Sequence, residues 1–193
     1  MHSYKKGLKS FNALVEALEQ IPTIGKKSAL KMAYTLGVEN KFLGIKIAHC
    51  IENAIHNVRK CSFCNALSEN ELCEICSDTS RDNSQLCFVL HSRDIFSIEE
   101  TKEYNGIYYV LENLEELDFE KLKKAIMQRG VKEIIFAFTP TLANEGIMLF
   151  IEDKLQNLSL HFSKIAQGVP TGIGLENIDQ LSLSRAIISR IKI

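Results

Sequence analysis

The sequence predicts an α+β protein of several parts: a helical region, a four-cysteine element, an α/β domain with a mostly parallel sheet, and a C-terminal helix. Three observations predict this order. Apolar residues recur at helical spacing through the first third, two Cys-x-x-Cys pairs follow, and short apolar runs then alternate with helical segments. The expected domains are residues 1–59, 60–77, 84–178 and 179–193.

The first region should hold three helices. Apolar residues from Leu8 to Leu18 and from Ala29 to Leu36 recur at helical spacing on either side of the turn IPTIG. Pro22 ends the first helix, Gly25 serves the turn, and a third helix carries an apolar side from Ile47 to Val58. A short helical corner is therefore expected before the cysteines.

The second of these helices opens with lysines. Unpaired backbone N–H groups and the positive end of the dipole favour phosphate at a helix start, and Lys26, Lys27 and Lys31 add charge there. Such contacts would hold a nucleic-acid backbone and would not read bases. The alternative is an ordinary helix corner with solvated lysines.

Charge is distributed unevenly along the chain. Residues 1–60 contain ten lysines or arginines against four acidic residues, and the other 133 contain thirteen against twenty. This asymmetry favours a polyanion partner for the N-terminal third, although exposed lysines on helices explain it equally well.

The cysteine element reads CSFCNALSENELCEIC. Its two Cys-x-x-Cys pairs present four soft ligands, which is the set that tetrahedral zinc prefers, and four thiolates leave no position for water. We therefore predict a structural zinc site. Its ligands are Cys61, Cys64, Cys73 and Cys76.

Other uses of these and neighbouring side chains stay open. A redox pair needs a single Cys-x-x-Cys, and an iron–sulfur cluster commonly uses other spacings. Cys50 and Cys87 fall outside the pattern and are expected to be small buried apolar residues. His49 and His56 are expected to be surface or packing histidines.

The sequence has few features of a secreted or membrane protein. No apolar run approaches the roughly 18 residues of a membrane span, and the opening MHSYKKGLKSF has no apolar stretch before a cleavage site. We expect a cytoplasmic protein without a membrane partner. A reducing cytoplasm keeps thiols free, which favours metal ligation over disulfides.

From residue 86 the pattern predicts strands alternating with helices. The expected strands are LCFVL (86–90), IYYVL (107–111), EIIFAF (133–138) and LHFSKIA (160–166). The expected helices lie at about 94–104, 118–129 and 145–157, with a last one in LSLSRAIISR. Such alternation is typical of a covered, mostly parallel sheet. The polar stretch 77–85 is the expected boundary before it.

The turn at Pro22 resembles a helix-hairpin-helix motif, a DNA-binding element without sequence preference whose hairpin usually reads Gly-Ile-Gly after a proline. Here Thr23 stands where the first glycine is expected. A β-branched residue resists positive φ, so we expect the hairpin to be reshaped at this position.

The α/β domain resembles the Toprim fold of primases, topoisomerases and some nucleases, in which carboxylates after two strands hold magnesium. The corresponding positions here are Leu90 or His91, and Thr139, Pro140 and Thr141. Leucine and threonine cannot replace carboxylates, although a weakened site remains open. The nearby acidic residues are Asp94, Glu99, Glu100, Glu145, Glu176 and Asp179.

The order of these parts resembles the bacterial RecR family. The matching segments are IPTIGKKSALKMA, the four cysteines, RDNSQLCFVLHSRDIFSIEET and AQGVPTGIGLENIDQLSLSRAI. Within the last, GVPTGIG (168–174) is read as a tight loop, since the chain has no Gly-x-x-x-x-Gly-Lys-Ser/Thr motif.

The resemblance implies a non-enzymatic DNA-repair protein that forms a ring of subunits, clamps DNA, and works with RecO and RecF to load recombinase onto gapped DNA. Lys27 and Lys31 match the family's DNA-binding positions, Lys26 stands where a proline is frequent, and Gly25 completes the hairpin. The alternatives are a magnesium-dependent nuclease or primase, and a zinc-stapled protein adapter that does not bind DNA.

Overall fold

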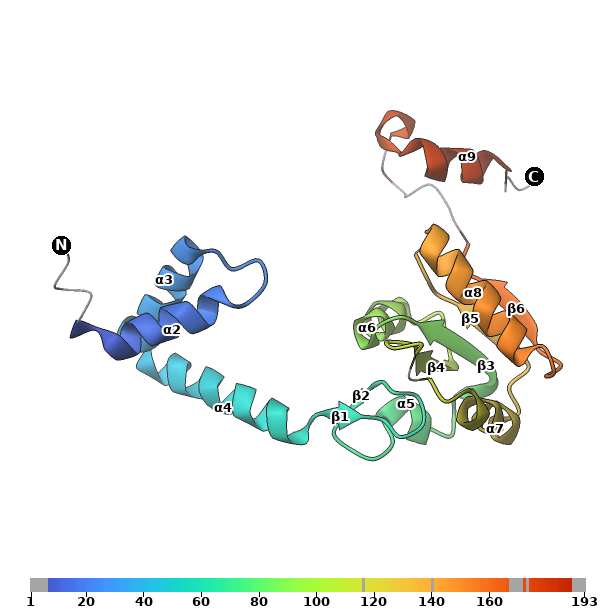
Figure 1. Ribbon diagram of the computed structural model, residues 1–193, viewed down its shortest axis with the longest axis horizontal. Coiled ribbons are helices and arrows are strands. Elements are labelled where there is room, and N and C mark those ends of the chain that lie inside the picture. Colours follow the sequence, from blue (N-terminus) through green and yellow to red (C-terminus); the bar gives the residue numbers. More distant parts are fainter. Residues whose placement is uncertain (1–6, 116, 140, 167–171, 173, 189–193) are drawn as a thin grey trace. The chain divides into compact units, whose positions relative to one another are not determined.

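The chain forms two compact units, Met1–Val58 and Arg59–Ile193. This computed structural model describes residues 7–115, 117–139, 141–166, 172 and 174–188. Figure 1 shows the helical first unit and the mixed second unit. The cysteine element and the sheet fall in the same unit, and the finer limits at 77 and 84 stay predictions.

The first unit consists of helices, as the apolar spacing predicts. They are α2 (Lys9–Glu19), α3 (Lys26–Tyr34), the π-helix η1 (Thr35–Glu39) and α4 (Lys41–Asn57). Asn40 caps α4, because its side chain accepts a hydrogen bond from the Leu43 N–H at 2.9 Å. Gly44 lets α4 approach η1 closely, since a Cβ there would collide with the Leu36 carbonyl.

This first unit buries little of its own apolar surface. Among its described residues, Ala29 and Ala33 are the buried hydrophobic ones. Many large apolar side chains are exposed, namely Leu30, Tyr34, Val38, Phe42, Ile45, Ile51 and Ile55. Exposed apolar surface of this extent is typical of interaction sites, because isolated domains rarely leave so many apolar side chains in water.

The second unit is built on a four-stranded sheet with the strand order β4-β3-β5-β6. The strands are β3 (Asp82–Val89), β4 (Gly106–Val110), β5 (Glu133–Phe136) and β6 (His161–Lys164). All three neighbouring pairs are parallel, which confirms the predicted sheet. β3 begins inside the polar stretch 77–85, so this stretch is part of the sheet as well as a connection.

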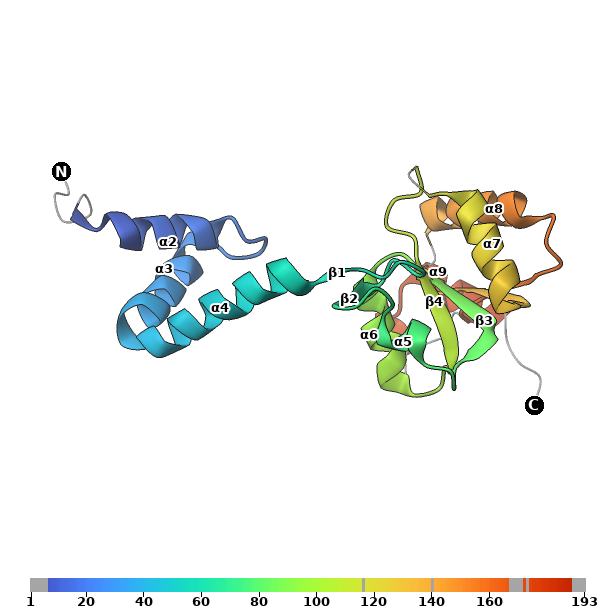
Figure 2. The same ribbon diagram turned by 90° about the horizontal axis from the view of Figure 1, so that it is seen from below.

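Helices cover both faces of the sheet, as Figure 2 shows. The connecting helices are α6 (Ser92–Thr101), α7 (Phe119–Arg129) and α8 (Leu142–Leu155). Leu122 of α7 and Ile151 of α8 pack with Phe88 and Phe136 on one face. On the other face, Ile95 of α6 packs with the four cysteines. This is the layered arrangement expected of parallel strands.

The remaining elements are short. The cysteine element contains β1 (Arg59–Lys60), β2 (Leu67–Ser68) and α5 (Glu74–Ser77), and the C-terminal part contains η2 (Leu175–Asn177) and α9 (Gln180–Ile188). α9 confirms the predicted last helix. Most of the loop predicted at 168–174 lies outside the described residues. Among the helices that the structure describes, none is both long and apolar enough to span a bilayer.

Candidate metal centre and nucleic-acid interface

The four predicted cysteines come together in one buried cluster. Their sulfur atoms all lie within 4.8 Å of one another, and each residue is at most 6% exposed. The first pair sits on a tight turn in which the Cys61 N–H donates to the Ala66 carbonyl at 2.7 Å. Asn65 occupies the left-handed region there, with φ 59°, a conformation that asparagine tolerates.

The cluster fits a tetrahedral zinc ion. Zinc–sulfur bonds of about 2.3 Å place neighbouring sulfurs about 3.8 Å apart, and the Cys64 and Cys73 sulfurs are 3.5 Å apart. Hydrogen bonds among the thiols lower the pKa of Cys61 and raise the pKa of Cys64 and Cys76, so binding of a metal by all four sulfurs would release protons from this cluster. With four sulfur ligands and no open position, the zinc is structural.

Cys87 provides a contrast within the same core. It is 3% exposed, and burial raises the pKa of its thiol to about 12. It therefore stays protonated and acts as a small apolar residue, as predicted. The prediction of a buried Cys50 is wrong: this residue is exposed on α4, because the helix buries none of its side chains within its own unit. His49 and His56 are exposed on the same helix, as expected for surface residues.

Contacts from the α/β layer hold the cysteine element in place. The Val110 N–H of β4 donates to the Cys64 carbonyl at 2.8 Å. Arg129 of α7 donates to the Cys76 carbonyl at 3.0 Å, and its guanidinium lies 4.5 Å from the centre of the Phe63 ring. Sequence reasoning missed Arg129, since no local pattern connects residues 53 positions apart.

The turn between α2 and α3 corrects the expectation of a reshaped hairpin. The Ile24 N–H donates to the Ile21 carbonyl at 3.1 Å across Pro22 and Thr23. Thr23 has φ 73°, the left-handed value that the third position of a type II turn requires. The hairpin thus keeps the conformation normally given to glycine, at a cost of roughly 1–3 kcal/mol in backbone strain.

Gly25 has a different role from the one that its place in a turn suggests. Its φ of −82° and ψ of 165° are available to any residue, and a Cβ at this position would meet nothing within 4 Å. It is the N-cap of α3 and makes no side-chain cap. The first backbone N–H groups of α3 therefore have no side-chain acceptor among the described residues.

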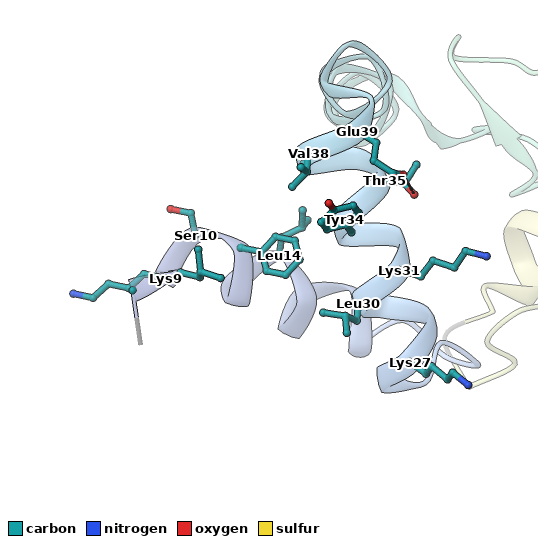
Figure 3. Close-up of a pocket in the computed structure, with 14 residues that line it drawn as sticks. Lys9, Ser10, Leu14, Lys27, Leu30, Lys31, Tyr34, Thr35, Val38 and Glu39 are labelled. Carbon is teal, nitrogen blue, oxygen red and sulfur yellow. Dashed lines mark hydrogen bonds between the residues drawn. The ribbon is translucent and has the colours of Figure 1, made fainter. Parts of the chain in front are cut away.

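The three predicted lysines are exposed and belong to α3. Figure 3 shows Lys27 and Lys31 extending from the same side of this helix, away from Leu30 and Tyr34. None of the three makes an ion pair with the residues that the structure describes. Lys26 and Lys27 thus place positive charge beside the open N–H groups at the start of α3, which is an arrangement that favours phosphate, and Lys31 adds charge in the last turn of the helix.

A groove lies between α2, α3 and η1 (Figure 3), and Lys27 and Lys31 are among the residues that line it. Its volume is about 1160 Å³. Its apolar lining is formed by Leu8, Phe11, Leu14, Leu30, Tyr34 and Val38. The predicted helices place these residues on apolar faces, but spacing alone cannot show that their packing leaves a groove open.

The carboxyl ends of the strands hold no gathered carboxylates among the described residues. Asp94 accepts from the His91 N–H at 2.9 Å, and Glu99 is paired with Arg81. Thr141 caps α8 by accepting from the Asn144 N–H at 3.2 Å. Among all the residues that the structure describes, the four cysteines are the group of potential metal ligands close enough together to share an ion.

The other candidate carboxylates are dispersed. Glu145 lies in the first turn of α8, and Glu176 lies in η2. Asp179 precedes α9, where its side chain accepts from the Ser182 N–H at 2.9 Å. Glu100 is exposed on α6, and Pro140 lies outside the described residues.

Comparisons with known proteins match both sites. A family model described as the RecR helix-hairpin-helix matches residues 11–55, and one described as the RecR zinc finger domain with four cysteines matches residues 58–78. The recombination protein RecR of Helicobacter pylori (strain Shi470) is 60% identical over 192 residues, which cover 100% of both chains. The same-named protein of a Nitratiruptor species is 53% identical, with 98% of this chain and 100% of the relative covered.

A further relative from Campylobacter jejuni (strain RM1221), also a recombination protein RecR, is 51% identical over 97% of this chain and 99% of its own. These full-length similarities agree with the helical hairpin, the cysteine cluster and the parallel α/β sheet. The chain belongs to the RecR family of recombination proteins.

Proposed function

We propose that this protein is a non-enzymatic mediator of recombinational DNA repair that binds DNA through the α2–α3 turn without sequence preference. The observation that carries the proposal is the N-terminus of α3, where open backbone N–H groups lie beside Lys26 and Lys27, with Lys31 further along the same helix, in a segment that matches a helix-hairpin-helix. Neutralising phosphates releases counterions, so such an interface binds any sequence.

We further propose that several copies form a ring around DNA in the cytoplasm. The apolar groove and the exposed apolar side of α4 support self-association, because one unit alone leaves them in water. A single α3 end would bind phosphate weakly, whereas copies facing a shared opening gain from effective concentration. Family membership supports RecO and RecF as partners in loading recombinase onto gapped DNA.

Removing one lysine should weaken binding in a salt-dependent way. Lys27→Ala eliminates one phosphate contact, so we expect lower affinity for gapped duplex DNA and a slope of log affinity against log salt that is shallower by about one. Fluorescence anisotropy over a salt series measures both. The control, Lys46→Ala on α4, removes the same charge away from the turn.

Two outcomes would contradict the proposal. An absence of binding to gapped DNA even at low salt would favour a zinc-stapled adapter. Metal-dependent cleavage that disappears in Glu145→Ala would favour a nuclease.

Gly25→Ala should impair binding without harming the fold. The added Cβ meets no protein atom, so thermal stability should remain close to that of the wild type. It would, however, stand over the first N–H groups of α3, where a phosphate must approach closely. Loss of one hydrogen bond to a charged group corresponds to on the order of tenfold weaker binding. Unchanged affinity with an unchanged melting temperature would show that phosphate does not approach α3 at this point.

A further inference from the structure

Thr23 is the unusual residue in the α2–α3 turn. Three non-glycine residues have positive φ in the described chain, namely Thr23, Asn65 and Lys102. Asn65 belongs to a type that tolerates this region, and Lys102 ends α6 as an unbranched residue. Thr23 is the β-branched member, so its backbone is the most strained of the three.

Local contacts do not account for the threonine. Its side chain is exposed, and its hydroxyl makes no hydrogen bond with the described residues. Glycine would adopt the same turn without strain. Strained residues cluster at functional sites, so the hydroxyl that distinguishes this residue from glycine is the group that needs an explanation.

The place of Thr23 supplies that explanation. It lies two residues before Gly25, the uncapped N-cap of α3, in the turn that leads directly to Lys26 and Lys27. A hydroxyl can donate one hydrogen bond to a phosphate oxygen and carries no charge. It would therefore extend the row of donors that begins with the N–H groups of α3.

We propose that Thr23 is a DNA-backbone-binding residue whose hydroxyl donates a hydrogen bond to a phosphate next to the one held by the N-terminus of α3. This inference rests on the proposed function, since it assumes that DNA lies against this turn. It assigns to Thr23 a contact that a glycine in the same turn cannot make.

The test compares two substitutions that differ by one hydroxyl. Thr23→Ser and Thr23→Ala both remove the β-branch and keep a side chain at positive φ, so their folding should be alike. We expect Thr23→Ser to bind gapped duplex DNA like the wild type, and Thr23→Ala to bind about fivefold more weakly. Because a neutral donor displaces no counterion, the salt slope should be the same in all three proteins.

Thr23→Gly completes the series. It should raise the melting temperature, because it removes the strain, and it should weaken DNA binding as Thr23→Ala does. Equal affinities of Thr23→Ser and Thr23→Ala would overturn the role of the hydroxyl. A shallower salt slope in Thr23→Ala would also overturn it, because the effect would then be electrostatic.

Lys27→Ala, measured alongside, separates the DNA interface from the role of Thr23 within it. If Lys27→Ala flattens the salt slope while the serine and alanine variants bind equally, the DNA interface stands and the inference about Thr23 fails. If Lys27→Ala changes neither affinity nor slope, the interface itself is misplaced, and the inference about Thr23 fails with it.

Discussion

Removal of zinc is expected to unfold the α/β layer of the second unit and to leave the helices of the first unit in place. Structural zinc contributes roughly 10–16 kcal/mol in small zinc domains, which equals or exceeds the roughly 5–15 kcal/mol that stabilises a whole domain. Here the cysteines share a buried cluster with Val89, Tyr108 and Val110 of the sheet. Loss of the metal therefore uncovers one face of the sheet as well as the cysteine element.

Hydrogen exchange read by mass spectrometry can locate this effect. After treatment with a zinc chelator under reducing conditions, peptides from β3 and β4 should lose protection, whereas peptides from α3 should not. Cys64→Ser should behave like the chelated protein. Cys50→Ser is the matched control, because that thiol is exposed and lies outside the cluster. Retained protection in β4 without zinc would show that the sheet folds independently of the metal.

The features of this protein that depend on local patterns could be predicted correctly from its sequence. The spacing of four cysteines defines a zinc site because each Cys-x-x-Cys turn is self-contained. The four apolar runs predict four strands for a similar reason, since buried parallel strands must be apolar throughout. The DNA contact of Lys27 and Lys31 stays a prediction, which follows from charges next to a helix start and from the family resemblance.

Features that depend on distant packing were missed or predicted wrongly. The association of the cysteine element with the sheet depends on Arg129 and Val110, which no local pattern connects to Cys64 or Cys76. The prediction that Cys50 is buried is wrong, because the apolar side of its helix stays exposed within the unit. Thr23 adopts a conformation that its own preference opposes, since the turn around Pro22 imposes it.

Arg81, in the polar stretch 77–85, makes a long-range contact that the sequence did not predict. Composition favours a boundary at 77–85, yet the Arg81 side chain within this segment is only 14% exposed and donates to Glu99 of α6 at 2.8 Å. Tyr108 of β4 donates to the same carboxylate at 2.6 Å. Burial, followed by this hydrogen bond, raises the pKa of Tyr108, so the phenol remains a donor. The network fastens the start of β3 to α6 and β4.

Substitution of Glu99 is therefore expected to destabilise the second unit strongly. In Glu99→Gln, the mostly buried Arg81 loses its closer charged partner and keeps the Asp78 carboxylate at 3.9 Å, and Tyr108 loses a carboxylate acceptor. Breaking fully buried pairs costs about 3–5 kcal/mol and breaking exposed pairs costs less than about 1 kcal/mol. Because the Glu99 side chain is 31% exposed, we expect a loss of about 2 kcal/mol in the free energy of unfolding at neutral pH, measured by urea denaturation. Glu100→Gln, at an exposed neighbouring position, should change it little.

The pH dependence of this difference tests the cause. Hydrogen bonds from Arg81 lower the pKa of Glu99 in the folded protein below its ordinary value of 4.5. A lowered folded-state pKa means that the stabilisation is fully present above the unfolded-state pKa and is lost as the pH falls from there through the folded-state pKa. The difference in the free energy of unfolding between Glu100→Gln and Glu99→Gln should thus be constant from neutral pH to about pH 5 and shrink below that. Both variants share the zinc site, so protonation of the cysteines affects them alike. A gap that persists unchanged into acid would show that shape and packing, not charge, make Glu99 important.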